Sequence, residues 1–292
     1  MLRSTVRLIC TDRDGNVSSG TGFYFTFKFA EDKFVPVIVT NRHVFQNAEH
    51  CEFKYTLADD NGKSTNVHEG FAITDFATTW IGHPDDSVDL AILPIQQFLE
   101  VLRVLGKRPL YTTLTDDIIA TEEMMASLDA IEDITMIGYP NSLIDDVNNL
   151  PITRRGITAT ACARHFRGKQ EFLIDAAVYP GSSGSPVFIY NQGSYSHGGG
   201  ITMGTRLMLL GIVFQVFLHK VTGEIISVPI PTSMIPVPVS DVPNNLGTCI
   251  QALRLFDFRK VLEKRIAAEL EKHSVPSPHA GLAAVNNEQT SS

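Results

Sequence analysis

The sequence predicts an all-β protein made of two successive β-rich units and a helix after them. In roughly residues 1–105 and again in residues 131–240, short apolar or alternating segments are separated by Gly, Asn and Asp clusters. Residues 248–272 instead carry apolar side chains near helical period. Short strands with turn residues between them are typical of barrels or sandwiches.

The first unit is expected to cover residues 1–105. Its candidate strands are VRLIC (6–10), GFYFTF (22–27), VPVIVT (35–40), EFKYTL (52–57) and DLAILPI (89–95). Residues 106–130 form a connecting segment, in which DDIIATEEMMASLDA combines helix formers with acidic residues near its start. We expect a short helix in this segment.

The second unit is expected to cover residues 131–240. Its candidate strands are ITMIGY (134–139), GITATAC (156–162), EFLIDAAV (171–178), SPVFIY (185–190), LMLLGIVFQVFL (207–218) and EIISVPIP (224–231). An amphipathic helix within residues 241–273 should pack across the outside of these units. The tail, residues 274–292, is rich in Ser, Pro, Asn and Ala and should be disordered.

Composition argues against several classes of protein. Of 292 residues, 43% are hydrophobic and 19% charged, which indicates an ordinary globular chain. The net charge of −8 and the lack of a dense basic run argue against binding to nucleic acid. The longest apolar run, Leu207 to Leu218, is too short to span a bilayer, and no secretory signal is evident, so we expect a cytoplasmic protein that does not bind membranes.

The four cysteines, Cys10, Cys51, Cys162 and Cys249, have no CxxC spacing. Scattered cysteines of this kind indicate reduced, buried thiols rather than a redox or metal site. We therefore expect no metal and no cofactor.

The segment YPGSSGSPVF (179–188) is the most informative for chemistry. Ser183 lies between Gly181 and Gly184, and flanking glycines allow a tight turn that exposes a hydroxyl. The same turn can aim the N–H groups of Gly181 and Ser183 at one point, as an oxyanion hole requires. A Gly/Ser-rich hairpin turn without chemistry is the competing interpretation.

A serine hydroxyl needs an adjacent base, and histidine can accept and return a proton near neutrality. Among nine histidines, His43 directly follows the apolar strand VPVIVT, where a strand end can hold an imidazole rigidly. The remaining eight are expected to have surface or structural roles.

A carboxylate must orient such a base. Asp89 is the favoured candidate, because it leads straight into the apolar segment DLAILPI and burial of an unpaired carboxylate would be costly. Asp85 and Asp86 compete for this role, although both fit a solvated loop, HPDDSV.

Read in order, TNRHVF, DLAILPI and DAAVYPGSSGSPVF resemble the histidine, aspartate and serine blocks of the trypsin/chymotrypsin clan, in particular its branch related to the Deg (high-temperature-requirement) proteases. Five further segments are similar: GTGFYF (20–25), MIGYPNSL (136–143), ITRRGITAT (152–160), LLGIVFQV (209–216) and VPIPTSMI (228–235). The resemblance covers roughly residues 1–240. It implies two packed six-stranded antiparallel β-barrels, followed here by the C-terminal α-helix that periodicity predicts, and a serine endopeptidase with His43, Asp89 and Ser183 as its triad.

The resemblance also implies a pocket for the substrate residue before the cut. Its lining would be Ala177 and the segment Ile212, Val213, Phe214 and Gln215. No acidic residue is present in this lining, so we expect a small or apolar residue there and protein or peptide substrates. Phe214 could equally be a core residue.

Three departures from the family pattern affect these expectations. Ser182 replaces the aspartate that pairs with a new N-terminus in trypsin-like zymogens, so activation by propeptide removal is not expected. Ser185 replaces a glycine, and no peptide-binding PDZ domain is expected after the second unit. A binding module that has kept this fold without activity is the alternative function.

An α/β-hydrolase fits poorly. The esterase-like run from His197 to Gly200 follows the candidate nucleophile instead of preceding it, and Ser185 replaces the glycine of a GxSxG elbow. We expect this run to be a hairpin tip.

Overall fold

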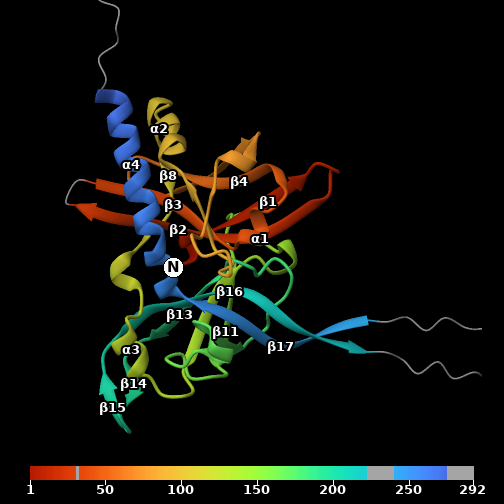
Figure 1. Cartoon of the computed structure of the whole chain (residues 1–292), viewed down its shortest axis with the longest axis vertical. Helices are drawn as coiled ribbons and strands as arrows, with labels where there is room; N and C mark the ends of the chain where they lie inside the picture. Colours follow the sequence, from red (N-terminus) through yellow and green to blue (C-terminus); the bar gives the residue numbers. More distant parts are fainter. Residues whose placement is uncertain (31–32, 222–239, 275–292) are drawn as a thin grey trace, which may run out of the picture.

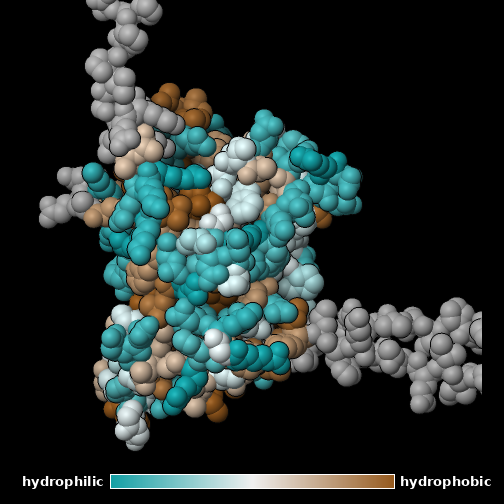
Figure 2. All heavy atoms as spheres, in the orientation of Figure 1, coloured by the Kyte–Doolittle hydropathy of each residue, from teal (hydrophilic) through white to brown (hydrophobic). Residues whose placement is uncertain are grey.

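A computed structural model describes residues 1–30, 33–221 and 240–274. Two β units lie one above the other, and the C-terminal helix runs along the first (Figure 1). The predicted all-β fold class is confirmed. On the face in Figure 2, hydrophilic residues cover most of both units and hydrophobic residues form small separate groups.

The first unit is a barrel-like nine-stranded sheet. Its strands are β1 (Thr5–Asp12), β2 (Val17–Ala30), β3 (Lys33–Thr40), β4 (Ala48–Ala58), β5 (Ser64–Ile73), β6 (Ile81–Gly82), β7 (Ala91–Pro94), β8 (Pro109–Leu110) and β9 (Leu114–Thr115). The main order is β5-β4-β1-β2-β3-β7-β6, with β8 added to β4 and β9 added in parallel to β2. Four of the candidate strands lie within β1, β2, β3 and β4, and β7 forms residues 91–94 of the fifth, 89–95.

The second unit is a closed barrel in the order β10-β11-β12-β17-β16-β13. The strands of this unit are β10 (Asp133–Gly138), β11 (Ile152–Thr158), β12 (Glu171–Asp175), β13 (Pro186–Asn191), β16 (Arg206–Val221) and β17 (Ser240–Gln251). A separate hairpin, β14 (Ser194–His197) and β15 (Gly200–Met203), places Gly198 and Gly199 at its tip. The expected glycine-rich hairpin tip is therefore confirmed.

The closing strand of this barrel lies later in the chain than expected. Residues 248–251 had been expected to begin the helix, but they belong to β17, which pairs with both β12 and β16. A short apolar run fits strand and helix spacing equally well, and the two ladders decide for the strand because they satisfy its backbone. The expected strand 224–231, the similar segment 228–235 and the tail from 275 lie outside the described residues.

Four α-helices and six 3-10 turns complete the described chain. The α-helices are α1 (Arg42–Phe45), α2 (Gln96–Val104), α3 (Glu122–Ala126) and α4 (Phe258–Ser274). The 3-10 turns are η1 (Leu2–Ser4), η2 (Phe76–Thr78), η3 (Asp116–Ile118), η4 (Pro140–Ser142), η5 (Phe166–Gly168) and η6 (Ala252–Asp257). α3 lies in the expected connecting segment and begins after Thr121, whose hydroxyl accepts the Met124 N–H. Within the described residues, no helix is long and apolar enough to cross a membrane.

One hydrophobic core joins the two units to the C-terminal segment. Successive side chains of a strand point to opposite faces, so Phe23 and Phe25 of β2 enter this shared core whereas Tyr24 packs inside the first unit. Phe188 of β13 and Phe258 of α4 enter the same core and are fully buried. Each buried Phe contributes about 1.5–3 kcal/mol. The shared core therefore fixes how the units pack.

Candidate active site

His43 lies where the buried strand β3 gives way to the short helix α1. Val44 and Phe45 anchor this helix in the core of the first unit, whereas 45% of the His43 side chain is exposed. Asn41, the residue before α1, is fully buried, and its side-chain amide donates to the carbonyl oxygen of Asp89 at 2.8 Å. The end of β3 and the helix α1 thus hold the imidazole at the surface.

Asp89 contacts His43 through both carboxylate oxygens. β3 and β7 pair antiparallel with Thr40 opposite Ala91, which brings the two residues together. Oδ2 of Asp89 lies 2.5 Å from Nδ1 of His43, and Oδ1 accepts the backbone N–H of His43 at 2.9 Å. A carboxylate held on Nδ1 leaves Nε2 as the free ring nitrogen, which is the arrangement a general base needs.

The two competing aspartates bind elsewhere. The carboxylate of Asp85 accepts from the backbone and the hydroxyl of Ser87, and Asp86 pairs with Arg42 at 2.8 Å. Hydrogen bonding from Ser87, followed by the contact with Arg254, lowers the pKa of Asp85 to about 2. Of the three aspartates, Asp89 alone has a hydrogen bond to His43 among the described residues.

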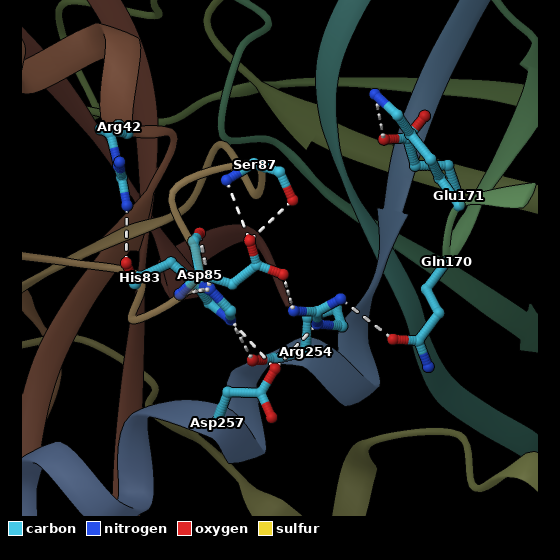
Figure 3. A network of polar contacts seen from close by, with 9 residues as sticks. Arg42, His83, Asp85, Ser87, Gln170, Glu171, Arg254 and Asp257 are labelled. Atoms are coloured by element: carbon cyan, nitrogen blue, oxygen red, sulfur yellow. Dashed lines mark hydrogen bonds and ion pairs between the residues drawn. The ribbon is translucent and has the colours of Figure 1, made fainter.

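Two arginines hold the loop that leads to Asp89 (Figure 3). Arg42 donates to the carbonyl oxygen of His83 at 2.6 Å, in addition to its contact with Asp86. Arg254, in η6, donates to Asp85 at 3.0 Å and to Gln170 of the second unit at 3.1 Å. The loop is therefore held by the first unit and by the C-terminal segment, and Gln170 ties Arg254 of that segment to the second unit.

His83 lies inside this network and has a structural role. Its ring is buried; Nδ1 accepts the N–H of Asp85 at 3.0 Å, and Nε2 lies 3.1 Å from a carboxylate oxygen of Asp257. Arg254 donates to the same oxygen of Asp257 at 2.7 Å. The expectation that His83 is a satisfied histidine is confirmed.

The loop that carries Ser183 takes the tight turn expected of it. Gly181 and Gly184 have φ values of +84° and +85°, which side chains rarely adopt. A Cβ atom on Gly181 would lie 2.5 Å from the carbonyl oxygen of Tyr139, and one on Gly184 would overlap the carbonyl oxygen of Thr21. Both positions therefore require glycine.

The backbone N–H groups of Gly181 and Ser183 are the pair that an oxyanion hole would use. The carbonyl oxygen of Pro180 accepts the N–H of Asn141 at 2.6 Å. Because C=O and N–H point in opposite directions across a trans peptide, this contact turns the N–H of Gly181 away from Asn141. Within the described part of the chain, neither this N–H nor that of Ser183 donates to a protein acceptor.

The loop that carries Ser183 is fixed against the strand end that precedes His43. The N–H of Thr21 donates to the carbonyl oxygen of Ser183 at 2.8 Å, and the hydroxyl of Thr40 donates to the carbonyl oxygen of Thr21 at 2.7 Å. Thr40 ends β3, three residues before His43. These contacts bring the serine, histidine and aspartate segments to one junction between the units.

A family model for the trypsin-like peptidase domain matches residues 20–194, a range that includes all three of these segments. The chain belongs to this family. Its recognition as a trypsin-like peptidase from the three sequence blocks is confirmed.

Solved structures similar to this trypsin-like peptidase are also proteases. The Rv3671c protease from M. tuberculosis, active form, is 17% identical over 95% of this chain and 84% of that chain, with a TM-score of 0.42. The HtrA-type protease AlgW with tripeptide is 17% identical over 94% of this chain and 62% of that chain, with a TM-score of 0.45. The serine endoprotease from Yersinia pestis is 16% identical over 93% of this chain and 64% of that chain, with a TM-score of 0.42. Comparison with curated proteins gives no match.

The residues expected to line a substrate pocket in this trypsin-like peptidase divide into two groups. Ile212 and Val213 are buried in the core, with exposed fractions of 0% and 1%. Val213 instead holds the loop that carries Ser183, because its carbonyl oxygen accepts the N–H of Gly184 and its N–H donates to the carbonyl oxygen of Ser185. The other three residues reach the surface to differing extents: Ala177 and Phe214 are partly buried and Gln215 is exposed.

Sequence reasoning did not identify the supporting residues of the site. Asn41, Thr21 and Arg254 each act through partners more than 40 positions away in the chain. Thr21 lies in GTGFYF, a segment that resembles the family, so the sequence pointed to this region. It did not indicate the contact of Thr21 with Ser183. No local pattern marks Arg254.

Proposed function

We propose that this protein is a serine endopeptidase with Ser183 as nucleophile, His43 as general base and acid, and Asp89 as the residue that orients His43. The observation that carries the proposal is the contact of both Asp89 oxygens with His43, one on Nδ1 and one on the backbone N–H. Membership of the trypsin-like peptidase family supports it.

The reaction proposed here proceeds in two halves. Oγ of Ser183 attacks the carbonyl carbon of the scissile bond and passes its proton to Nε2 of His43, while the N–H groups of Gly181 and Ser183 stabilise the oxyanion. The C–N bond then breaks, and His43 gives the proton to the leaving amine. Water, deprotonated by His43, hydrolyses the acyl-enzyme and restores the Ser183 hydroxyl.

The substrates proposed are proteins or peptides with a small or apolar residue before the cut. Ala177 and Gln215 remain candidates for contact with that residue, because each retains exposure, whereas Phe214 packs against the shared core. Ile212 and Val213 would act by supporting that surface from the core.

Labelling with a fluorophosphonate tests the proposal directly. Oγ of Ser183 would displace fluoride from phosphorus, its proton passing to His43, and the labelled peptide would contain residues 179–188. Mass spectrometry should find one label, on Ser183, and none on Ser182 or Ser185. A folded protein that takes no label would instead be a binding module that has kept the fold.

A further inference from the structure

Arg154 is a charged residue on the inner face of the second barrel. It lies on β11 opposite Met136 of β10, which is fully buried in the barrel core. Directly opposite residues of an antiparallel pair point to the same face, so the Arg154 side chain also points inward. Its neighbour Arg155 points outward, with 75% of its side chain exposed.

The Arg154 guanidinium joins two points of the segment that precedes Ser183. Nη1 donates to the carbonyl oxygen of Ala177 at 2.5 Å and to the hydroxyl oxygen of Ser182 at 3.0 Å. The same hydroxyl oxygen accepts the backbone N–H of Tyr179 at 3.2 Å. One nitrogen thus braces the turn from residue 177 to residue 182, which contains Gly181 and ends next to Ser183.

This brace has a cost in stability. Nε and Nη2 of Arg154 are buried and have no hydrogen-bond partner, and no carboxylate pairs with the guanidinium among the described residues. Burial lowers the pKa of Arg154 to about 10. Because an unpaired buried charge destabilises a fold, an apolar side chain of similar length would serve packing better.

A direct role in binding an acidic substrate side chain does not fit the same geometry. The two unpaired nitrogens are closed to solvent, so a carboxylate could reach them only if the loop moved. Nη1 already donates its hydrogen bonds to this loop, to the carbonyl oxygen of Ala177 and the hydroxyl oxygen of Ser182. The guanidinium is therefore placed to support the loop.

We propose that Arg154 is a positioning residue that holds segment 177–182 so that the N–H groups of Gly181 and Ser183 face the oxyanion. This inference rests on the proposed peptidase function. The brace comes from a strand inside the barrel and ends on the Ser182 hydroxyl, so the loop needs no newly cut N-terminus to keep its shape.

The test compares Arg154→Met with Arg155→Met in the full chain. For each variant, the rate constant of fluorophosphonate labelling at Ser183, kcat and KM on a peptide that the wild type cleaves, and the melting temperature are measured. Arg154→Met should lower kcat and the labelling rate by about 10–100-fold, less than the 10²–10³ reported for deleting an oxyanion donor outright. KM should stay within about threefold, and the melting temperature should be unchanged or higher because a desolvated charge is removed. Arg155→Met should resemble the wild type.

Two results would overturn the positioning role: a labelling rate and kcat for Arg154→Met within twofold of the control, or a lower melting temperature with activity lost in proportion to unfolding. Failure of the peptidase proposal is distinguishable from both, because the wild type and Arg155→Met would then also remain unlabelled while folded.

Discussion

The backbone N–H of Thr21, in the first unit, donates a hydrogen bond of 2.8 Å to the carbonyl oxygen of Ser183, in the second. The hydroxyl of Thr21 also donates to the carbonyl oxygen of Gly181, at 2.9 Å. Two carbonyls of the loop that carries Ser183 are therefore held by one residue of the neighbouring unit. Any change that separates Thr21 from this loop should affect stability and activity together.

Gly184→Ala is expected to have such an effect. The new methyl group would overlap the carbonyl oxygen of Thr21, at a φ of +85° that costs an alanine about 1–2 kcal/mol before any clash. We expect loss of most activity and a clear fall in the midpoint of urea unfolding. Gly193→Ala is the matched control, because Gly193 has the same φ of +85° but no atom within 4 Å of a new Cβ.

Both variants carry the same backbone strain, so the difference between their urea midpoints measures the contact between Thr21 and the loop that carries Ser183. Equal urea midpoints for Gly184→Ala and Gly193→Ala would show that the loop can move away from Thr21 without cost.

Ser183→Ala should abolish nearly all peptidase activity while the protein stays folded, because removal of a triad serine leaves only the contribution of binding and the oxyanion hole. Ser185→Ala is the control, whereas Ser182→Ala removes the acceptor of Arg154 and of the Tyr179 N–H and should lower activity less than Ser183→Ala. Ser185 is fully buried and its hydroxyl has no hydrogen-bond partner within the described residues, so its loss should be neutral or slightly stabilising. Hydrolysis of a fluorogenic peptide by the three variants decides the matter; near wild-type turnover by Ser183→Ala would exclude it as nucleophile.

The sequence allowed the fold class to be predicted and singled out His43, Asp89 and Ser183, whose catalytic roles stay a prediction, because both inferences depend on local patterns. Alternation along β2 and β3 reflects which face is buried, and the glycines around Ser183 reflect a backbone turn. Residues 248–251 were wrongly expected to be helical, since their spacing fits either structure until β12 and β16 are paired with them. α2 was not anticipated either.

The supporting contacts could not be predicted for a physical reason. Arg154 and Arg155 are adjacent arginines in one strand, and only the register against β10 decides which of them points inward. Similarly, Arg254 meets Asp85 only because the C-terminal segment returns to the first unit. Such pairings are fixed by the packing of distant segments.

The cysteines should all be free thiols, in spite of one close pair. Cys10 and Cys51 are directly opposite each other on β1 and β4, and Cys162 and Cys249 are both buried in the second barrel. Burial raises the pKa of Cys162 to about 12 and that of Cys249 well above its usual value, so thiolate, the reactive form, is scarce. Thiol titration of the unfolded, non-reduced protein should count four, and the native protein should react slowly. A count of two, with Cys10 and Cys51 recovered in one linked peptide, would contradict this.

The last prediction separates Asp89 from the aspartates near it. Asp89→Asn should keep the fold, because an amide can still accept the backbone N–H of His43, but it replaces the carboxylate that faces Nδ1. An amide group can donate to Nδ1, which favours the wrong tautomer and leaves a proton on Nε2, where the base must be free. By analogy with the template triad, we expect turnover to fall about 10⁴-fold.

Asp86→Asn is the control for charge, since Asp86 is 94% exposed and pairs only with Arg42 in the described chain. Exposed ion pairs contribute little, about 0–1 kcal/mol, so turnover should change by no more than a few-fold. Asp85→Asn weakens one contact of Arg254 and should show an intermediate loss that reflects a looser loop. Turnover of the three variants shows how much each aspartate contributes to activity, and circular dichroism checks that each variant is folded. An Asp89→Asn variant with nearly normal turnover, beside an inactive Asp86→Asn variant, would transfer the orienting role to Asp86 and leave the peptidase proposal intact.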